Sequence, residues 1–278
     1  GRRRVHRAAV TAVAARFRLD AEMVRRGLAR SRGQAAAMIE QGRVVVRGVP
    51  AGKPATQIDK DTPVLVAETA EREWASRGAA KLLGALDAFE VPVVGLRCLD
   101  AGASTGGFTD VLLDRGAAQV VAVDVGYGQL IWRLRNDDRV QVHDRTNVRA
   151  LTADDIGGRA ALTVADLSFI SLRTVLPALV ACTEPGGTLL PMVKPQFEVG
   201  KARLGSGGVV RDPTLRLETL TDVATPAREL GLVVVDATAS PLPGPSGNVE
   251  YFLRLHAGGA DTDAGDEVLA RAVEEGPR

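Results

Sequence analysis

The strongest constraint on the fold is an alternation of strand-like and helix-like segments that begins at Arg97 and continues nearly to the end of the chain. Apolar runs of strand length are RCLDA, QVVAVDVG, LTVADLSF, GTLLPMVKP, LVVVDATA and EYFLRLHA. Helix-like stretches between them are FTDVLLDRG, LRTVLPALVAC and residues 213–230. This alternation predicts an α/β fold with a largely parallel sheet, covered on both faces, whose ligands lie at the carboxyl ends of the strands.

The stretch DAGASTGGFTD, residues 100–110, joins the first of these strands to a helix. It is not a Walker loop, because Phe108 stands where the lysine should be, and it lacks the dinucleotide fingerprint, because Ser104 replaces the second glycine. Asp124 ends the next strand, where a carboxylate can accept both hydroxyls of a ribose. An adenosine without a phosphate to cradle indicates S-adenosyl-L-methionine, and a simple turn without a ligand is the alternative.

The charge of the chain is strongly segregated although its formal net value is only +1. Residues 1–67 hold 14 Lys and Arg against 5 Asp and Glu, whereas the remainder holds 21 against 29. A basic part joined to an acidic part predicts a polyanionic partner, with nucleic acid as the first candidate. An uneven surface without such a partner is the alternative.

Two short helices followed by a small sheet are expected in the basic part. Asp20 is a predicted N-cap of the first helix, and Ser31 and Gln34 have the spacing of a capping box for the second. A turn at Arg47-Gly48 separates strand-like pieces. The side chains that we expect to contact phosphates are Arg18, Arg25, Arg26, Arg30, Arg32, Arg43 and Arg47.

Four charged residues fall where such a sheet would place an active site. Asp166 follows LTVA, Lys194 follows LLPMV, Glu250 begins the final strand, and Lys81 lies in the helix-like RGAAKLLGALDAF. Each of them alone is better explained as a solvated strand end than as a catalytic residue. Their combination with the glycine-rich loop is far more specific.

Together these motifs resemble the TlyA-type, or haemolysin A-like, ribose 2′-O-methyltransferases of the larger FtsJ-like group. The resemblance covers nearly the whole chain and rests on SRGAAKL, LDAGASTGGFTDVLL, VDVGYGQL, DRTNVR, ADLSFISL, VKPQFEVGK, GGVVRD and SPLPGPSGNVEYFL. Residues 19–66 resemble an alpha-L-type RNA-binding domain. The chain departs from these patterns at Ala80, where relatives often carry His, and at Arg47, where Asn or Asp is expected.

The resemblance implies a Rossmann-like methyltransferase sheet, mostly parallel with an antiparallel last strand, preceded by a small α+β RNA-binding domain. It implies 2′-O-methylation of cytidine in small- and large-subunit ribosomal RNA, with ribosomal subunits as partners. Its catalytic tetrad corresponds to Lys81, Asp166, Lys194 and Glu250. We expect Lys194 to act as the base, Lys81 to be the neighbouring cation that favours a neutral amine, and the carboxylates to orient both lysines. The cofactor contacts expected from the loop and the resemblance are Gly102, Ala103, Ser104, Thr105, Gly106, Gly107, Phe108, Asp124, Val125, Asp144, Arg145 and Asp166.

The predicted organisation is a basic tail (1–18), an RNA-binding domain (19–67), a linker (68–76), a methyltransferase domain (77–258) and a C-terminal tail (259–278). Two cysteines in apolar contexts and three histidines without ligand spacing disfavour a metal site. Without a run of ~18 apolar residues or a secretory signal, we expect a cytoplasmic monomer with no membrane contact. A membrane-active haemolysin and a non-catalytic ribosome-assembly factor are the alternative functions; the intact loop, Asp124 and the tetrad disfavour the latter.

Overall fold

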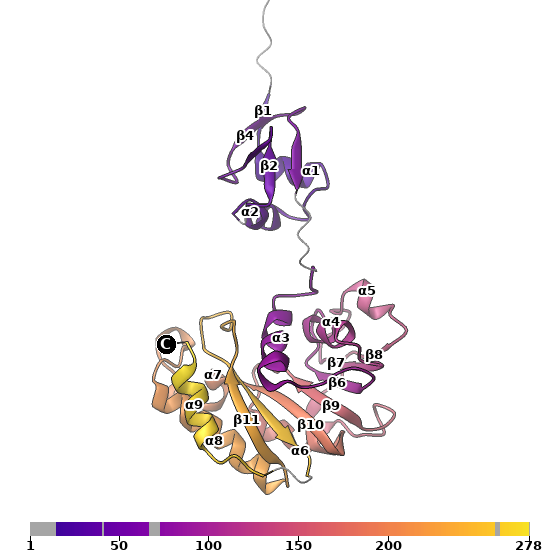
Figure 1. Ribbon diagram of the computed structural model, residues 1–278, viewed down its shortest axis with the longest axis vertical. Helices are drawn as coiled ribbons and strands as arrows, with labels where there is room; N and C mark the ends of the chain where they lie inside the picture. The colour runs from indigo at the N-terminus through magenta and orange to yellow at the C-terminus, as the bar shows by residue number, and fades with distance from the viewer. Residues whose placement is uncertain (1–14, 41, 67–72, 259–261, 278) are drawn as a thin grey trace, which may run out of the picture. The chain divides into compact units, whose positions relative to one another are not determined.

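The chain forms two compact units, Gly1–Glu73 and Trp74–Arg278 (Figure 1). The computed structural model describes residues 15–40, 42–66, 73–258 and 262–277. The division at residue 73 falls within the proposed linker 68–76. Most of the proposed N-terminal tail, up to residue 14, and residues 259–261 and 278 of the proposed C-terminal tail lie outside the described residues.

The described residues of the smaller unit form an α+β domain with two helices and two small antiparallel sheets. Its apolar core contains Leu19 and Met23 from the first helix and Ile39 from the second. One sheet pairs β1 with β4, and the other has the order β3-β2-β5. The elements are β1 (Arg16–Arg18), α1 (Leu19–Arg25), α2 (Arg32–Glu40), β2 (Val44–Val46), β3 (Val49–Pro50), β4 (Gln57–Asp59) and β5 (Val64–Val66).

Two local predictions for this unit are confirmed. Arg47 (φ 52°) and Gly48 (φ 80°) both adopt left-handed backbone conformations between β2 and β3, as a two-residue hairpin turn that follows the strand twist requires. The hydroxyl of Ser31 accepts a hydrogen bond from the backbone N–H of Gln34 at 3.1 Å and so caps α2. The Gln34 side chain accepts from the N–H of Arg30 at 2.7 Å, which is one residue earlier than a standard capping box requires.

The prediction that Asp20 is an N-cap is wrong. Helix α1 begins at Leu19, and its first free N–H groups donate to backbone carbonyls of Thr56 and Pro54 instead of to a side chain. The buried carboxylate of Asp20 binds the guanidinium groups of Arg18 and Arg32, at 2.8 and 3.1 Å. The carbonyls that cap α1 come from a segment distant in sequence, so local pattern could not reveal them.

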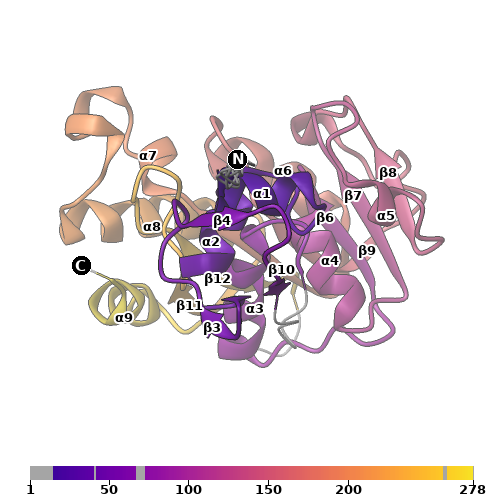
Figure 2. The same cartoon turned by 90° about the horizontal axis from the view of Figure 1, so that it is seen from above.

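The larger unit is built on a seven-stranded sheet with the order β11-β12-β10-β9-β6-β7-β8. Strand β12 is antiparallel to both of its neighbours, and the other pairs are parallel. The predicted Rossmann-like sheet with an antiparallel last strand is therefore confirmed (Figure 2). The strands are β6 (Arg97–Ala101), β7 (Gln119–Val123), β8 (Val140–His143), β9 (Ala160–Ala165), β10 (Thr183–Val193), β11 (Val233–Ala239) and β12 (Tyr251–His256).

Helices cover both faces of this sheet (Figure 1). Residues of α6, α8 and α9 share one apolar core with the strands, and residues of α3 and α4 share the other. Adjacent residues Cys98 and Leu99 belong to opposite cores, as the strand pleat requires. The helices are α3 (Gly78–Phe89), α4 (Gly107–Asp114), α5 (Trp132–Arg135), α6 (Leu172–Ala181), α7 (Pro195–Glu198), α8 (Pro213–Glu229) and α9 (Glu267–Glu275), with short 3₁₀ turns at Val148–Ala150, Lys201–Arg203 and Ser206–Gly208.

The thiols of Cys98 and Cys182 are buried and unlinked, and burial raises the pKa of Cys98 to about 12. Within the described ranges, no group of three His, Cys, Asp or Glu side chains is placed to hold a metal ion. The helices of the same ranges are all too short or too polar to cross a bilayer.

Candidate active site

Two cavities adjoin at the carboxyl edge of the parallel strands. One has a volume of about 630 Å³ and the other about 460 Å³. Both are lined by Gly102 and Ser104, which follow β6, and by Asp166 and Ser168, which follow β9. A group bound in one cavity can therefore meet a group bound in the other beside Asp166.

The glycine-rich loop owes its shape to a close approach between two strand ends. Gly102 has φ +90°, and a Cβ atom at this position would lie 2.4 Å from the backbone carbonyl oxygen of Asp166. The backbone N–H of Asp166 donates to the carbonyl of Ala101 at 3.1 Å, which ties β9 to the start of the loop. Only glycine combines this conformation with this approach, so Gly102 is required by the geometry of the site itself.

Asp124 is held beside the loop by backbone donors. One carboxylate oxygen accepts from the N–H of Ser104 at 2.8 Å, and the other accepts from the N–H of Gly126 at 2.7 Å. A carboxylate oxygen has more than one acceptor site, so both can still accept a further hydroxyl. Since Asp124 lines the smaller cavity, a ribose diol fits the arrangement.

The predicted cofactor contacts divide between the two cavities. Gly106 lines neither cavity, and nor do Asp144 and Arg145. Those lining the smaller cavity are Gly102, Ser104, Asp124, Val125 and Asp166, and those lining the larger are Gly102, Ala103, Ser104, Thr105, Gly107, Phe108 and Asp166.

Asp144 and Arg145 are engaged in contacts beside the smaller cavity. The carboxylate of Asp144 binds Arg135 at 2.7 Å, and this hydrogen-bonded guanidinium lowers the pKa of Asp144. Arg145 places its guanidinium 4.2 Å from the ring centre of Tyr127. Asn147, which the sequence did not single out, is among the residues that line the smaller cavity.

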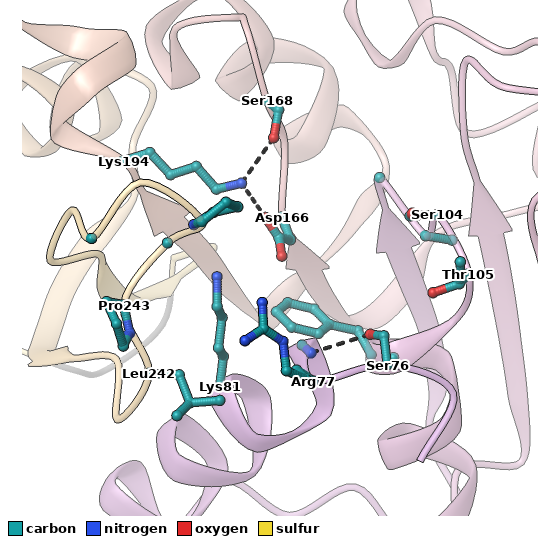
Figure 3. Close-up of a pocket in the computed structure, with 18 residues that line it drawn as sticks. Ser76, Arg77, Lys81, Ser104, Thr105, Asp166, Ser168, Lys194, Leu242 and Pro243 are labelled. Carbon is teal, nitrogen blue, oxygen red and sulfur yellow. Dashed lines mark hydrogen bonds and ion pairs between the residues drawn. The ribbon is translucent and has the colours of Figure 1, made fainter. Parts of the chain in front are cut away.

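The four charged residues of the predicted tetrad form two ion pairs, and Figure 3 shows the one between Lys194 and Asp166. The Nζ atom of Lys81 lies 2.5 Å from Glu250, and the Nζ atom of Lys194 lies 2.5 Å from Asp166. Figure 3 shows both lysine side chains reaching toward the larger cavity, Lys81 from α3 and Lys194 from the end of β10. The side chain of Glu250 is 0% exposed and that of Asp166 is 23% exposed, so water reaches the carboxylate of the second pair but not that of the first.

The sheet topology explains why residues so far apart in sequence meet here. Val193 pairs with Tyr251 across the antiparallel strands β10 and β12, and continuing that register makes Lys194 and Glu250 the next pair. Because β12 runs against the other strands, its first residues lie at the edge where the parallel strands end. Asp166 reaches the same edge at the end of β9.

Two neutral side chains contact the ion pairs. Lys194 donates a hydrogen bond to the hydroxyl of Ser168 at 3.0 Å, and the amide of Gln196 donates to Glu250 at 3.3 Å. Gly244 also approaches Glu250 so closely that an added Cβ would lie 2.4 Å from its carboxylate. Each ion pair is therefore fixed by groups beyond its own two partners.

Asp100 is a fully buried carboxyl at the start of the loop. The hydroxyl of Thr109 donates to it at 2.7 Å, which links β6 to α4. Burial, together with the nearby charges of Asp166 and Asp124, raises the pKa of Asp100 to about 7. The protonation state of this group therefore affects the charge beneath the loop near neutral pH.

Sequence reasoning missed several residues that line the cavities. Arg77 lines the larger cavity, and its position four residues before Lys81 places both on one face of the helical turn. The four-residue spacing from Lys81 could have identified Arg77 as a site residue from the sequence alone. Among the described residues, no carboxylate lies within ion-pairing distance of Arg77.

Phe169 lines the smaller cavity, and 91% of its surface is exposed. Its ring lies 5.1 Å from that of Phe197. Its isolated position in the sequence gave no signal that it belongs to the site.

The predicted RNA-binding arginines of the smaller unit differ in their exposure. Arg25 and Arg26 both bind the buried Glu22, but Arg26 also donates to the backbone carbonyls of Asp59, Lys60 and Thr62. Arg26 therefore supports the fold. Other predicted arginines form ion pairs through side chains that are more than two-fifths exposed; these are Arg18, Arg25, Arg30, Arg32 and Arg47.

Comparisons with known proteins agree with the division of the chain into two units. The FtsJ-like methyltransferase family matches residues 74–257, and the S4 domain matches residues 17–64. A Mycobacterium tuberculosis protein named 16S/23S rRNA (cytidine-2'-O)-methyltransferase TlyA is 60% identical over 95% of this chain and 100% of its own length. Hemolysin A of Brachyspira hyodysenteriae is 35% identical over 85% of this chain and 98% of its own length.

Solved structures extend the similarity to three dimensions. A Streptococcus thermophilus protein whose name includes the word hemolysin has a TM-score of 0.72 and 35% identity. The match covers 95% of this chain and 96% of that chain. Proteins named for haemolysis and a protein named for RNA methylation thus share the architecture of this chain.

Proposed function

Because this chain belongs to the FtsJ-like methyltransferase family and carries an S4 domain, we propose that it methylates the 2′-hydroxyl of cytidine in 16S and 23S ribosomal RNA. The observation that carries the proposal is the meeting of two lysine–carboxylate pairs beside a cavity formed by a glycine loop and Asp124. We further propose that it acts as a cytoplasmic monomer on ribosomal subunits.

The smaller cavity fits S-adenosyl-L-methionine as the methyl donor. When bound, this cofactor supplies a methyl group activated by a positively charged sulfur. Asp124 would accept the ribose hydroxyls, and the backbone of Gly102 and Ser104 would line the rest. The loop offers no lysine for a phosphate, which disfavours a nucleotide with a phosphate chain.

The tetrad would prepare the acceptor hydroxyl. Lys194 would take the proton of the 2′-hydroxyl as its oxygen bonds to the methyl carbon and the bond from that carbon to the sulfur breaks, which leaves a neutral thioether. Asp166 would hold the amine in position. Lys81, a second cation at the same cavity, would stabilise negative charge that develops on the oxygen. Glu250 would hold Lys81 in place.

The direct test is methyl transfer from radiolabelled S-adenosyl-L-methionine to purified 16S- and 23S-containing subunits, followed by nuclease digestion. Labelled 2′-O-methylcytidine is the expected product. Label on a base, or no label despite cofactor binding, would contradict the proposed reaction. Absence of cofactor binding would favour an assembly factor, and leakage of liposomes at the same protein concentration would favour a membrane-active protein.

We expect the smaller unit to act in substrate docking. A chain of residues 74–278 retains both cores of the larger unit, so it should bind S-adenosyl-L-methionine with unchanged affinity. Its methylation rate at limiting subunit concentration should fall by about tenfold or more, because exposed arginines no longer contact phosphates. Calorimetry and the radiolabel assay measure the two quantities. Equal rates for both chains at low subunit concentration would show that the S4 domain is dispensable.

We expect Arg77 to bind a phosphate of the RNA backbone next to the acceptor ribose. Arg77→Ala should raise KM for subunits by about tenfold while changing kcat little, since one charge-assisted contact is lost. The slope of log affinity against log salt concentration should become shallower by about 1. Arg159→Ala, an exposed arginine at the opposite edge of the sheet, is the matched control. A salt slope identical to that of the unmodified protein would refute this contact.

A further inference from the structure

The hydroxyl of Ser168 accepts a hydrogen bond from Lys194, the proposed base. It lies 3.0 Å from Nζ of Lys194, and the same nitrogen lies 2.5 Å from Oδ1 of Asp166 (Figure 3). Ser168 also belongs to the wall that the two cavities share. Lys194 therefore contacts one charged and one neutral acceptor at the boundary between the cavities.

These two contacts determine where a neutral amine can direct its lone pair. A neutral lysine amine carries two hydrogens and one lone pair, arranged tetrahedrally about the nitrogen. If Asp166 and Ser168 each accept one hydrogen, the lone pair must point in the one remaining direction. Lys194 lines the larger cavity, where the acceptor ribose would bind, so that direction is available to the 2′-hydroxyl.

We propose that Ser168 is a positioning residue that orients the amine of Lys194 for removal of the 2′-hydroxyl proton. This inference rests on the proposed function. Without the serine hydroxyl, the contact with Asp166 still leaves the amine two staggered positions about its Cε–Nζ bond, and only one of them directs the lone pair at the acceptor. A protein with a misdirected amine should bind RNA with the same affinity but transfer the methyl group more slowly.

A neutral hydroxyl at residue 168 is better suited than a carboxylate to orient the amine of Lys194. A second carboxylate at residue 168 would add negative charge next to Lys194 and favour the protonated amine, which cannot accept a proton. A hydroxyl accepts the hydrogen bond without adding charge. Ser168 is exposed, so a threonine can place the same hydroxyl there with its methyl group directed to solvent.

The experiment is single-turnover methylation of ribosomal subunits by the full chain at saturating S-adenosyl-L-methionine. Ser168→Ala should lower the rate about tenfold, and Ser168→Thr should restore it to within about threefold of the unmodified protein. The dissociation constant for S-adenosyl-L-methionine, measured by calorimetry, should change less than about twofold in both variants. Ser206→Ala, in an exposed loop, is the matched control.

Three outcomes would overturn the role of Ser168: an unchanged rate in Ser168→Ala, an equal loss in the threonine variant, or a loss explained by weaker cofactor binding. Thermal melting of each variant checks that the fold is retained. An unmodified chain that labels no RNA would refute the proposed function and this inference together. Labelled RNA with an unchanged Ser168→Ala rate would refute the inference alone.

Discussion

Replacing Lys194 with alanine is expected to lower the rate of methyl transfer by a factor of about 10³ or more, because the group that removes the proton is lost. The fold should tolerate the change. The side chain of Asp166, the partner left behind, is 23% exposed, so water can solvate its carboxylate. Single-turnover transfer of radiolabel to subunits measures the rate, and calorimetry should show unchanged cofactor affinity.

Two further variants sharpen this result. Lys194→Arg keeps the positive charge but cannot become neutral, so it should be as inactive as the alanine variant. Lys201→Ala removes an exposed lysine from the following loop and should retain most of the activity. An arginine variant with more than about a tenth of the original rate would show that residue 194 acts through its charge and not as a base.

Gly102→Ala is expected to weaken binding of S-adenosyl-L-methionine by about 100-fold or more, through backbone strain and a steric clash. The added Cβ would lie 2.4 Å from the backbone oxygen of Asp166, which cannot move without displacing the end of β9. The loop would have to shift away from the cavity that it lines. Calorimetric titration with the cofactor measures the effect, and thermal melting separates it from a loss of folding.

Gly95→Ala is the matched control for this prediction. Gly95 also has a positive φ, +74°, but a Cβ there meets no atom within 4 Å. It therefore introduces backbone strain without a clash and lies outside both cavities. If Gly102→Ala bound the cofactor as tightly as Gly95→Ala does, the close approach to Asp166 would not control the site.

Much of the larger fold could be predicted because its strands are long, apolar and separated by regular helices. The parallel arrangement then places strand ends at one edge, which is why Asp166 and Lys194 were accessible to sequence reasoning. Strand β8 was not predicted, since VQVH is short and half polar. Helix α7 was not predicted either, because four residues carry no helical period.

The details of the site depend on contacts between distant segments, which sequence spacing does not encode. The pairing of Lys194 with Asp166 follows from the parallel pairing of β9 with β10, and that of Lys81 with Glu250 from the packing of α3 beside the start of β12. The catalytic and binding roles of these residues remain predictions for the experiments above.

The position of β12 has a consequence for when the protein becomes active during its own synthesis. Although β12 is the last strand among the described residues, it lies inside the sheet, between β10 and β11. A nascent chain that has not yet released residues 251–256 from the ribosome exit tunnel cannot close this gap or place Glu250 beside Lys81. Catalytic competence therefore arises only after residues 250–256 have left the exit tunnel.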